Sequence, residues 1–272
     1  MEKIAVILPV YRGDRVAFFS KAVESILFQT YRCFHLFVGV DGPVDKEMDD
    51  YLIALEKQNY VTVVRFVDNR GMTAVLNDLI KMANKEDFDF IARMDADDIS
   101  MSDRFEKQIH FLNSHKDVDV VGGAIKRIDT MGTPHEIKKY PLTHDECYKR
   151  FAKRNPLSHP AVMFKKSFFI KLGGFYRSEY RTNQDTMLWF DGFKNGIKMA
   201  NIPDVVLEFR VTDDMLGSRR GGWKRAKKQL DTRLMINKGL GYGIKSDIYA
   251  YLVCLYMVLP VFIKKIIYKT FK

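Results

Sequence analysis

The stretch FDFIARMDADD, residues 88–98, joins a short apolar run to three closely spaced aspartates. Phe88–Met94 predicts a buried β-strand, because it is short, apolar and bounded by polar residues. A tight turn would then present Asp95, Asp97 and Asp98 together. Carboxylates crowded on one turn repel one another unless a cation or hydrogen bonds compensate. Since a hard divalent ion takes oxygen ligands, the stretch predicts a candidate metal site at a strand end.

Apolar runs typical of strands alternate with helical patterns on both sides of this stretch. Such alternation predicts an α/β fold with a mostly parallel central sheet flanked by helices on both faces. Beyond Ile125 the pattern is mixed. Expected strands are Lys3–Val10, His35–Val40, Val61–Val67, Val118–Ile125, His159–Phe164 and Val205–Val211, and expected helices are Val16–Phe28, Met48–Gln58, Thr73–Ala83, Arg104–Ser114 and Asp185–Asn195.

Aspartates follow three of the first four expected strands. Ligands of parallel sheets bind beyond the carboxyl ends of the strands. We therefore expect the candidate site at this edge of the sheet. The four ends are Pro9-Val10-Tyr11, Asp41-Gly42, Asp68-Asn69-Arg70-Gly71 and Asp95-Ala96-Asp97-Asp98.

Two other interpretations fit the aspartates taken alone. They could cap the helix that begins near Ser102 or Asp103. They could also open a calcium-binding EF-hand loop, in which Glu106 would supply the last ligand. The spacing argues against an EF-hand, because Ile99 stands where an oxygen ligand is required and Ser100 stands where glycine is required.

Short motifs occur in a fixed order between about Lys3 and Arg220. They are Pro9-Val10-Tyr11; Glu24-Ser25-Ile26-Leu27 with Gln29-Thr30-Tyr31; Asp41-Gly42; Asn69-Arg70-Gly71 with Leu76-Asn77; Met94-Asp95-Ala96-Asp97-Asp98; Lys107-Gln108; His159-Pro160; Leu172-Gly173-Gly174-Phe175; and Gln184-Asp185 with Leu188-Trp189. With this ordered set the chain resembles the inverting family-2 glycosyltransferases, which have the nucleotide-sugar-binding GT-A fold. It looks most like the bacterial transferases that build O-antigen, capsule and exopolysaccharide repeat units.

The resemblance implies a UDP-sugar donor and a divalent metal, Mn²⁺ or Mg²⁺. Pro9 and Tyr11 would line the nucleotide pocket, and Asp41 would accept a hydrogen bond from the uracil ring. Asp95 would serve the nucleoside side. Arg70 would help to neutralise the diphosphate, although a surface arginine after a turn is an equal alternative.

The resemblance also implies the metal ligand and the catalytic base. Asp97 would bind the metal directly, with Asp98 supporting it or facing the donor sugar. Asp185 would take the proton of the acceptor hydroxyl, and its place at a helix start favours its charged form. Capping of that helix is the alternative role. Trp189 could form a wall for a sugar, or could be a core aromatic.

The chain departs from the family pattern at two positions. Thr212 stands where many relatives carry a histidine metal ligand. Water and diphosphate would then complete the metal shell, or the metal would bind weakly. Asp41-Gly42-Pro43 has one carboxylate where relatives often have two.

The C-terminal stretch 219–272 carries the basic excess of the chain. It holds 13 Lys and Arg against two Asp, a net charge of +11, whereas residues 1–218 have a net charge of −1. The apolar run Ile248–Ile263 is shorter than the roughly 20 residues that a membrane-spanning helix needs. We expect a catalytic domain over residues 1–218 and a tail that lies on an anionic membrane surface. An ordinary packed C-terminal helix is the alternative.

Arg219 and Arg220 in this tail would bind the membrane or a polyprenyl-diphosphate-linked saccharide acceptor. The N-terminus MEKIAVILPVY lacks a signal-peptide pattern, and the three cysteines form no close pair, so we expect a cytoplasmic protein at the inner face of the membrane.

Two further functions are alternatives to the transfer of a sugar. A nucleotidyltransferase of the same fold would need a glycine-rich phosphate loop, which Tyr11–Arg15 is not. A basic nucleic-acid-binding protein fits the charge of the tail, but not its apolar run or the acidic strand ends. No nucleic-acid partner is therefore expected.

Overall fold

The computed structural model describes residues 1–180, 182–212 and 222–259. The chain divides into two compact units. The first, the catalytic unit, comprises residues 1–148 and 155–210, and the second, the C-terminal unit, comprises residues 149–154 and 211–272. The boundary expected from the sequence, between residues 218 and 219, lies outside the described residues. Each unit is described by itself.

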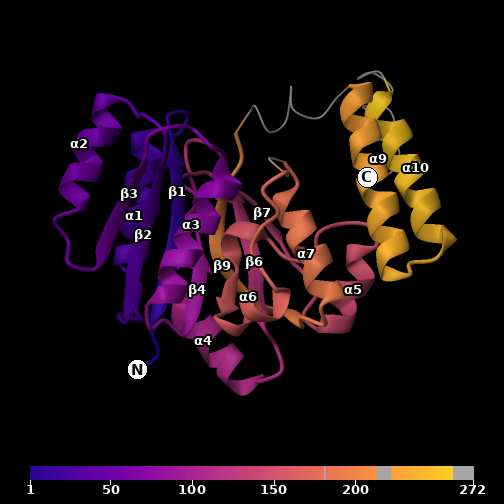
Figure 1. Cartoon of the computed structure of the whole chain (residues 1–272), viewed down its shortest axis with the longest axis horizontal. Coiled ribbons are helices and arrows are strands. Elements are labelled where there is room, and N and C mark those ends of the chain that lie inside the picture. Colours follow the sequence, from indigo (N-terminus) through magenta and orange to yellow (C-terminus); the bar gives the residue numbers. More distant parts are fainter. Residues whose placement is uncertain (181, 213–221, 260–272) are drawn as a thin grey trace. The chain divides into compact units, whose positions relative to one another are not determined.

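Four parallel strands form one half of the sheet in the catalytic unit (Figure 1). β1, β4 and most of β2 are buried on both faces, as the central strands of parallel sheets are, whereas β3 at the sheet edge is partly exposed. The register places Tyr11 opposite Asp41, and Asp41 opposite Phe66, so the carboxyl ends reach the same edge. In sheet order the strands are β3 (Val61–Phe66), β2 (Phe34–Asp41), β1 (Ile4–Tyr11) and β4 (Phe90–Arg93).

The second half of the sheet mixes strand directions. β8 lies antiparallel between β4 and β6, while β6 and β9 form a long parallel ladder. β5 pairs antiparallel with the end of β9, and β7 pairs antiparallel with β6. The bounds are β5 (Ile99–Ser100), β6 (Val120–Ile128), β7 (Pro134–Lys138), β8 (Met163–Lys165) and β9 (Met199–Arg210).

Helices cover both faces of the parallel strands. The even-numbered residues of β1 share an apolar core with α1, α2 and α4. On the other face, α3 approaches β2 so closely that a Cβ at Gly39 would lie 2.3 Å from Val75. The helices of this unit are α1 (Val16–Leu27), α2 (Lys46–Leu55), α3 (Met72–Lys85), α4 (Arg104–Ser114), α5 (His144–Phe151), which runs into the C-terminal unit, η1 (His159–Ala161), α6 (Ser167–Leu172) and α7 (Gln184–Lys194).

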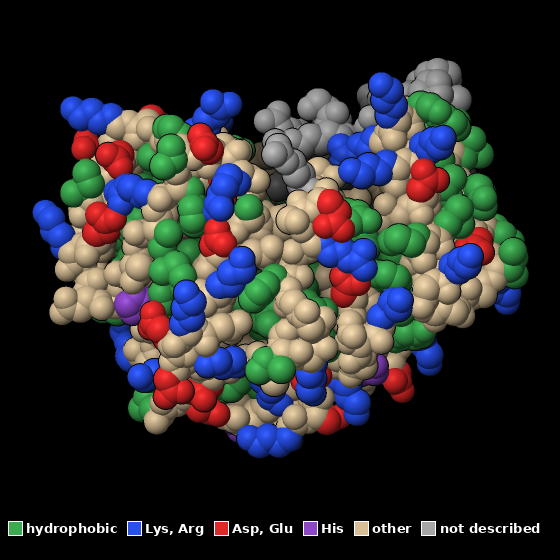
Figure 2. All heavy atoms as spheres, viewed as in Figure 1, with side chains coloured by type: hydrophobic (Ala, Val, Ile, Leu, Met, Phe, Trp, Pro, Cys, Tyr) green, Lys and Arg blue, Asp and Glu red, His purple; other side chains and the backbone are tan. Residues whose placement is uncertain are grey.

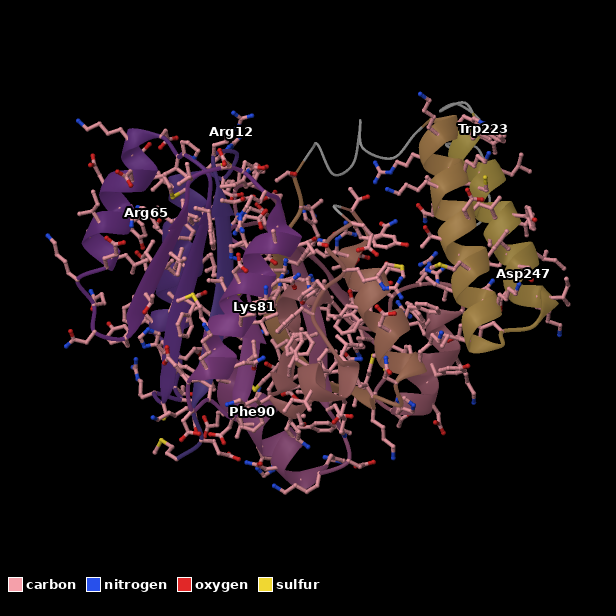
Figure 3. All side chains as sticks on the ribbon, viewed as in Figure 1. Arg12, Arg65, Lys81, Phe90, Trp223 and Asp247 are labelled. Atoms are coloured by element: carbon pink, nitrogen blue, oxygen red, sulfur yellow. The ribbon has the colours of Figure 1, made fainter. Side chains whose placement is uncertain are left out.

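The C-terminal unit contains a hairpin of two helices, α9 (Trp223–Leu240) and α10 (Ile244–Val258), joined by three residues. Trp223 begins α9 and Asp247 lies on α10 in Figure 3. Ala226, Ala250 and Cys254 are buried in this unit. Within the described part of the chain, no helix is both long enough and apolar enough to cross a membrane.

The expected strand His159–Phe164 is wrong in its first half. The structure has a short 3₁₀ helix at His159–Ala161, and the strand begins only at Met163. Proline explains the difference, because Pro160 has no backbone N–H to donate to a sheet ladder. The late strand is longer than expected, since β9 begins at Met199. The expected apolar run Ile248–Ile263 is helical to Val258, and residues 260–263 lie outside the described part.

Gln29 links the end of α1 to the segment that follows the three aspartates. Its buried Nε2 donates to Ser100 Oγ (3.1 Å) and to the carbonyl of Met101 (2.7 Å), and its Oε1 accepts from the N–H of Phe105 (3.2 Å). The motif residue Gln29 therefore has a structural role beside the candidate site.

Gln29→Ala is expected to lower the free energy of unfolding by about 2–3 kcal/mol, because it leaves buried polar groups without partners. Urea unfolding followed by circular dichroism measures this change. Gln58→Ala, at an exposed glutamine, is the control and should change stability by less than about 0.5 kcal/mol. Equal effects at the two positions would contradict the role given to Gln29.

Candidate functional site

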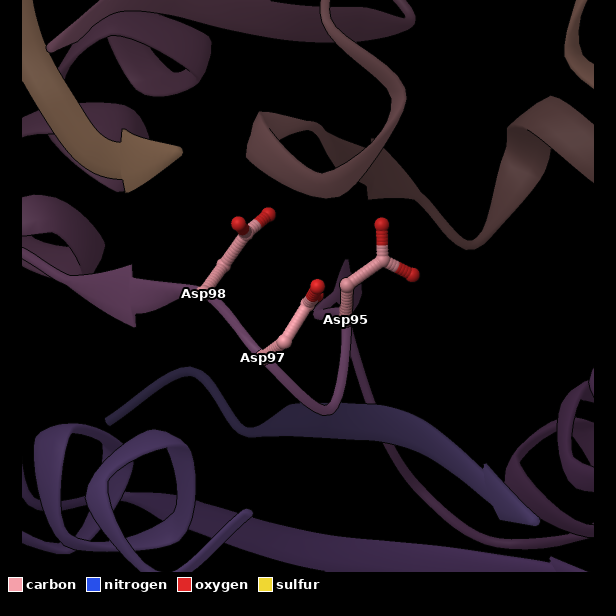
Figure 4. A group of neighbouring side chains, drawn as sticks. All are labelled: Asp95, Asp97 and Asp98. Carbon is pink, nitrogen blue, oxygen red and sulfur yellow. The ribbon is translucent and has the colours of Figure 1, made fainter. Parts of the chain in front are cut away.

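The acidic turn, Asp95, Asp97 and Asp98, connects β4 to β5 and presents its three side chains on one side of the loop (Figure 4). One ligand oxygen from each lies within 4.8 Å of those of the others. Asp95 and Asp97 are half-buried, and Asp98 is only 1% exposed. The spacing suits carboxylates that share a cation.

The electrostatics of the acidic turn also suit a cation. Burial, and then the charges of Asp95 and Asp97, raise the pKa of Asp98 well above its usual value. Burial, and then the charge of Asp95, raise the pKa of Asp97 to about 6. Oδ2 of Asp98 is buried and has no hydrogen-bond partner among the described residues. A divalent ion would satisfy that oxygen and relieve the repulsion, so the residues fit a metal.

Arg210, at the end of β9, holds the acidic turn through two hydrogen bonds. Its N–H donates to Asp98 Oδ1 (2.8 Å), and its Nε donates to the carbonyl of Asp97 (2.9 Å). The guanidinium also lies 4.3 Å from the centroid of the Phe18 ring. α4 begins after Asp103, and Asp98 is engaged by β9. The helix-capping interpretation of the acidic turn is therefore not supported.

Asp14 is a fourth carboxyl near the acidic turn, and the sequence patterns did not single it out. Its Oδ2 accepts from the N–H of Tyr11 (2.9 Å). Burial raises the pKa of Asp14 to about 7, with contributions from the charges of Asp97 and Asp95. The β1–α1 loop therefore approaches the acidic turn.

Tyr11 and Pro9 occupy the carboxyl end of β1, as expected for a pocket at this edge. Pro9 is buried, and Tyr11 is 41% exposed. The Tyr11 ring lies against Gly13, where a Cβ would come within 2.4 Å of the tyrosine oxygen. A side chain at position 13 would thus displace the ring.

Asp41 holds the loop that follows β3. It is 4% exposed, and its two carboxylate oxygens accept from the N–H groups of Arg70 (2.7 Å) and Gly71 (2.9 Å). The Arg70 guanidinium pairs with Asp78 on α3 (2.7 Å) and lies 4.1 Å from the centroid of the Phe66 ring. In this structure both residues make structural contacts, and their expected contacts with a donor stay predictions.

Asp185 lies in the first turn of α7 and is half-buried. Its Oδ2 accepts from Asn155 Nδ2 (2.7 Å), and its Oδ1 accepts from the N–H of Thr186 (2.7 Å). Burial raises the pKa of Asp185, and these bonds and the charge of Arg93 oppose the rise. Asn183, just before the helix, has φ 62° and is the one non-glycine residue with positive φ in the described part. Strain of this kind is typical of functional sites.

A network around Tyr176 ties the approach to α7 onto α3. The N–H of Tyr176 donates to Asn77 Oδ1 (2.9 Å), and Asn77 Nδ2 donates to the carbonyl of Tyr176 (2.8 Å). The Tyr176 hydroxyl lies 2.6 Å from Nε2 of buried His159. Burial, with the charge of Arg93, lowers the pKa of His159 well below its usual value, so its ring is neutral.

Trp189 is fully buried and packs against Phe164 and His159. Of the two roles expected for Trp189, the structure favours that of a core aromatic over that of a wall for a sugar. Arg219 and Arg220 lie outside the described residues, whereas Thr212 is described and half-buried.

Arg93 and Arg210 are the functional candidates that sequence reasoning missed. Arg93, at the end of β4, forms an ion pair with Asp95. Both arginines are 2% exposed. For Arg93 the available signal was a lone arginine at the end of an otherwise apolar strand, because charged residues are rarely buried unless they are paired. Arg210 had no such signal, since its strand also carries Asp204 and Glu208.

A family model and individual relatives both identify the chain as similar to glycosyltransferases. The family model described as "Glycosyl transferase family 2" matches residues 5–173. The amylovoran biosynthesis glycosyltransferase AmsE of Erwinia amylovora is 27% identical, over 97% of each chain. The UDP-Gal:alpha-D-GlcNAc-diphosphoundecaprenol beta-1,3-galactosyltransferase of Escherichia coli is 29% identical, over 84% of this chain and 81% of its own length.

Solved structures show the same fold. TarS residues 1–349 from S. aureus, crystallised in complex with UDP-GlcNAc, superpose with a TM-score of 0.65 over 93% of this chain and 70% of that chain, at 14% identity. The similarity confirms the expected GT-A fold.

Mn²⁺ is expected to raise the Tm of the protein, and to raise it more near pH 8 than near pH 5. Protons compete with the cation at low pH, because the pKa of Asp97 is about 6 and that of Asp98 is raised. Without a cation, these raised pKa values favour the folded state at low pH, and this contribution is lost as the pH rises through them. Differential scanning fluorimetry measures the shift.

Asp97→Asn should lose the response to Mn²⁺, whereas Asp50→Asn on the exposed face of α2 should keep it. A Tm shift that survives in Asp97→Asn would place the metal elsewhere.

Proposed function

Because the chain belongs to glycosyl transferase family 2, we propose that it moves a hexose or N-acetylhexosamine from a UDP-sugar to a lipid-diphosphate-linked saccharide, with inversion. The acidic turn carries this proposal, since its crowded and partly unsatisfied carboxylates suit a metal, which in turn would bind a diphosphate. Two relatives add support through their names, one for amylovoran biosynthesis and one for transfer of galactose from UDP-Gal to a diphosphoundecaprenol-linked sugar. The process would be the assembly of bacterial surface polysaccharide.

The metal, Mn²⁺ or Mg²⁺, would be held by Asp97 and by the unsatisfied oxygen of Asp98. When bound, such an ion neutralises negative charge that develops on the leaving diphosphate. Asp95 would face the ribose, and Tyr11 and Pro9 would line the nucleotide pocket. UDP-GlcNAc in the complex with TarS, which has the same fold, makes a UDP-sugar the first donor to test.

Asp185 would be the catalytic base. The acceptor hydroxyl attacks the anomeric carbon from the face opposite the diphosphate, and its proton passes to the carboxylate. The bond from the anomeric carbon to the β-phosphate oxygen breaks, and UDP leaves. Asn155 and Thr186 fix the carboxylate by hydrogen bonds of 2.7 Å each. The raised pKa favours uptake of the proton.

The C-terminal hairpin would place the protein on an anionic membrane surface. Residues at helical spacing on α10 form an apolar stripe, each more than half exposed: Ile244, Ile248, Tyr251, Leu252 and Leu255. Hydrophobic side chains gather along α10 in Figure 2. α9 exposes Lys224, Arg225, Lys227 and Lys228. Apolar burial and attraction to anionic lipid act together in such helices, and Arg219 and Arg220 precede this basic run.

Asp185→Asn should lower kcat by at least about a hundredfold, because the acceptor hydroxyl loses its base. The Kd of the donor should change less than about twofold, since the substitution keeps the size of the side chain. The assay combines Mn²⁺, a panel of UDP-sugars and a polyprenyl-diphosphate sugar acceptor. In the wild type, the rate should fall as the pH drops through the raised pKa of Asp185. Loss of donor binding in Asp185→Asn would remove the base assignment.

Ile248→Glu is expected to reduce co-flotation with vesicles that contain phosphatidylglycerol, because it puts a charge on the apolar stripe of α10. Ile170→Glu is the matched control, since Ile170 is also an exposed isoleucine but lies on α6. Equal flotation of the two variants would refute the assignment of the stripe. If the wild type floats equally well with vesicles made only of neutral lipid, the role of charge is refuted.

A further inference from the structure

Arg93 lies beside the acidic turn and has no part in the proposed chemistry. It ends β4, is 2% exposed, and pairs through Nη2 with Oδ1 of Asp95. Among the ion pairs of the described residues, no other involves a carboxylate of the acidic turn. The contacts of Arg210 with this turn go to a carbonyl and, through its backbone N–H, to Asp98. Arg93 is therefore the side-chain cation that pairs directly with the turn.

A structural role alone does not account for Arg93. Its Nε and Nη1 are buried and find no hydrogen-bond partner among the described residues. Burying a guanidinium with unmet donors costs stability, and an apolar side chain of similar volume is often as stable or more so. Arg104 shows the contrast. It is also fully buried, but it bonds to Gln108 and to the carbonyls of Arg93 and Val162.

The charge of Arg93 acts on more than its direct partner. It opposes the rise in pKa that burial causes at Asp97, at Asp98 and at Asp185. The positive charge thus lies close enough to offset both the acidic turn and the proposed base. A divalent cation at the same turn would feel repulsion from the same charge.

A contact through sulfur connects Arg93 to the start of α7. Sδ of Met72 accepts from Arg93 Nη2 (3.5 Å) and from Gln184 Nε2 (3.5 Å). Gln184 is the neighbour of Asp185 in sequence. Arg93 therefore touches the acidic turn on one side and, through Met72, the segment that carries the proposed base on the other.

We propose that Arg93 is a positioning residue that reserves Asp95 for the nucleotide and keeps the acidic turn from binding a divalent cation strongly before the diphosphate arrives. The proposal rests on the proposed function, in which the turn binds a metal and a UDP-sugar. With Asp95 held by Arg93, Asp97 and Asp98 remain for the metal. The negative diphosphate then offsets the repulsion from Arg93, so metal and donor bind cooperatively.

The test compares Arg93→Met with the wild type by isothermal titration with Mn²⁺, in the absence and in the presence of UDP. Removing the charge should lower the Kd of Mn²⁺ without UDP by at least about fivefold, because a unit charge acts strongly at this range. The factor by which UDP tightens Mn²⁺ binding should shrink, since the two bindings are thermodynamically linked. With saturating UDP-sugar, kcat should fall at least about tenfold, because Asp95 is no longer held in place.

Two variants separate charge and position from general loss of packing. Leu112→Ala removes a fully buried apolar side chain on α4 and should lower Tm, but it should leave the Kd of Mn²⁺ within about twofold of the wild type. Arg93→Lys keeps the charge, so its Kd for Mn²⁺ should also stay within about twofold, while kcat falls because the lysine ammonium does not reproduce the contacts of Nη2 with Asp95 and Met72. If Arg93→Met does not fold, Arg93→Gln removes the charge and keeps N–H donors, and it gives the same comparison.

Unchanged or weaker Mn²⁺ binding in the neutral variants would overturn the role of Arg93 while leaving the proposed function in place. A wild type that neither binds Mn²⁺ nor transfers sugar from any donor would overturn the proposed function and this inference together.

Discussion

Repulsion between carboxylates is the constraint that organises the catalytic unit. The parallel register of β1, β2 and β4 brings strand ends to one edge, and the loops there carry Asp14, Asp41 and the acidic turn. Such a concentration of acid is unfavourable unless positive charge and N–H donors meet it. Buried Arg93 pairs with Asp95, and buried Arg210 donates to Asp98 through its backbone N–H. Backbone N–H groups also donate to the carboxylates of Asp41 and Asp14. The remaining imbalance, most evident at Asp98, is what makes the residues at this edge suited to a cation.

Much of the fold could be predicted from the sequence, because the signals were local. Apolar runs bounded by polar residues indicated the parallel strands, and α4 begins and ends at the residues expected from its pattern. The 3₁₀ helix at His159–Ala161 was missed because its neighbours are as apolar as a strand and only Pro160 marked the difference. The antiparallel placement of β8 between β4 and β6 had no local signal, since pairing partners depend on the whole chain.

The candidate site was predictable to a different extent. Strand ends and motif order indicated Asp95, Asp97, Asp98 and Asp185, because aspartate at such positions is visible in the sequence. The contacts of these residues were not visible. Asp41 proves to hold the Arg70–Gly71 backbone, and the side chain of Arg70 lies against Phe66 and Asp78. Long-range partners such as Asn155 for Asp185 arise from tertiary structure, which no spacing rule anticipates.

The bonds that complete the site join segments far apart in the chain. The N–H of Arg210 meets Asp98 across 112 positions, and Tyr176 meets Asn77 across 99. Contacts of such separation require loop closure before they form, so we expect them to form after the local contacts. During synthesis, the parallel strands can pair while the acidic turn still lacks β9. The nascent chain thus carries the acidic turn without its contacts from Arg210 until β9 has been synthesised, so the turn is completed only after the parallel strands exist.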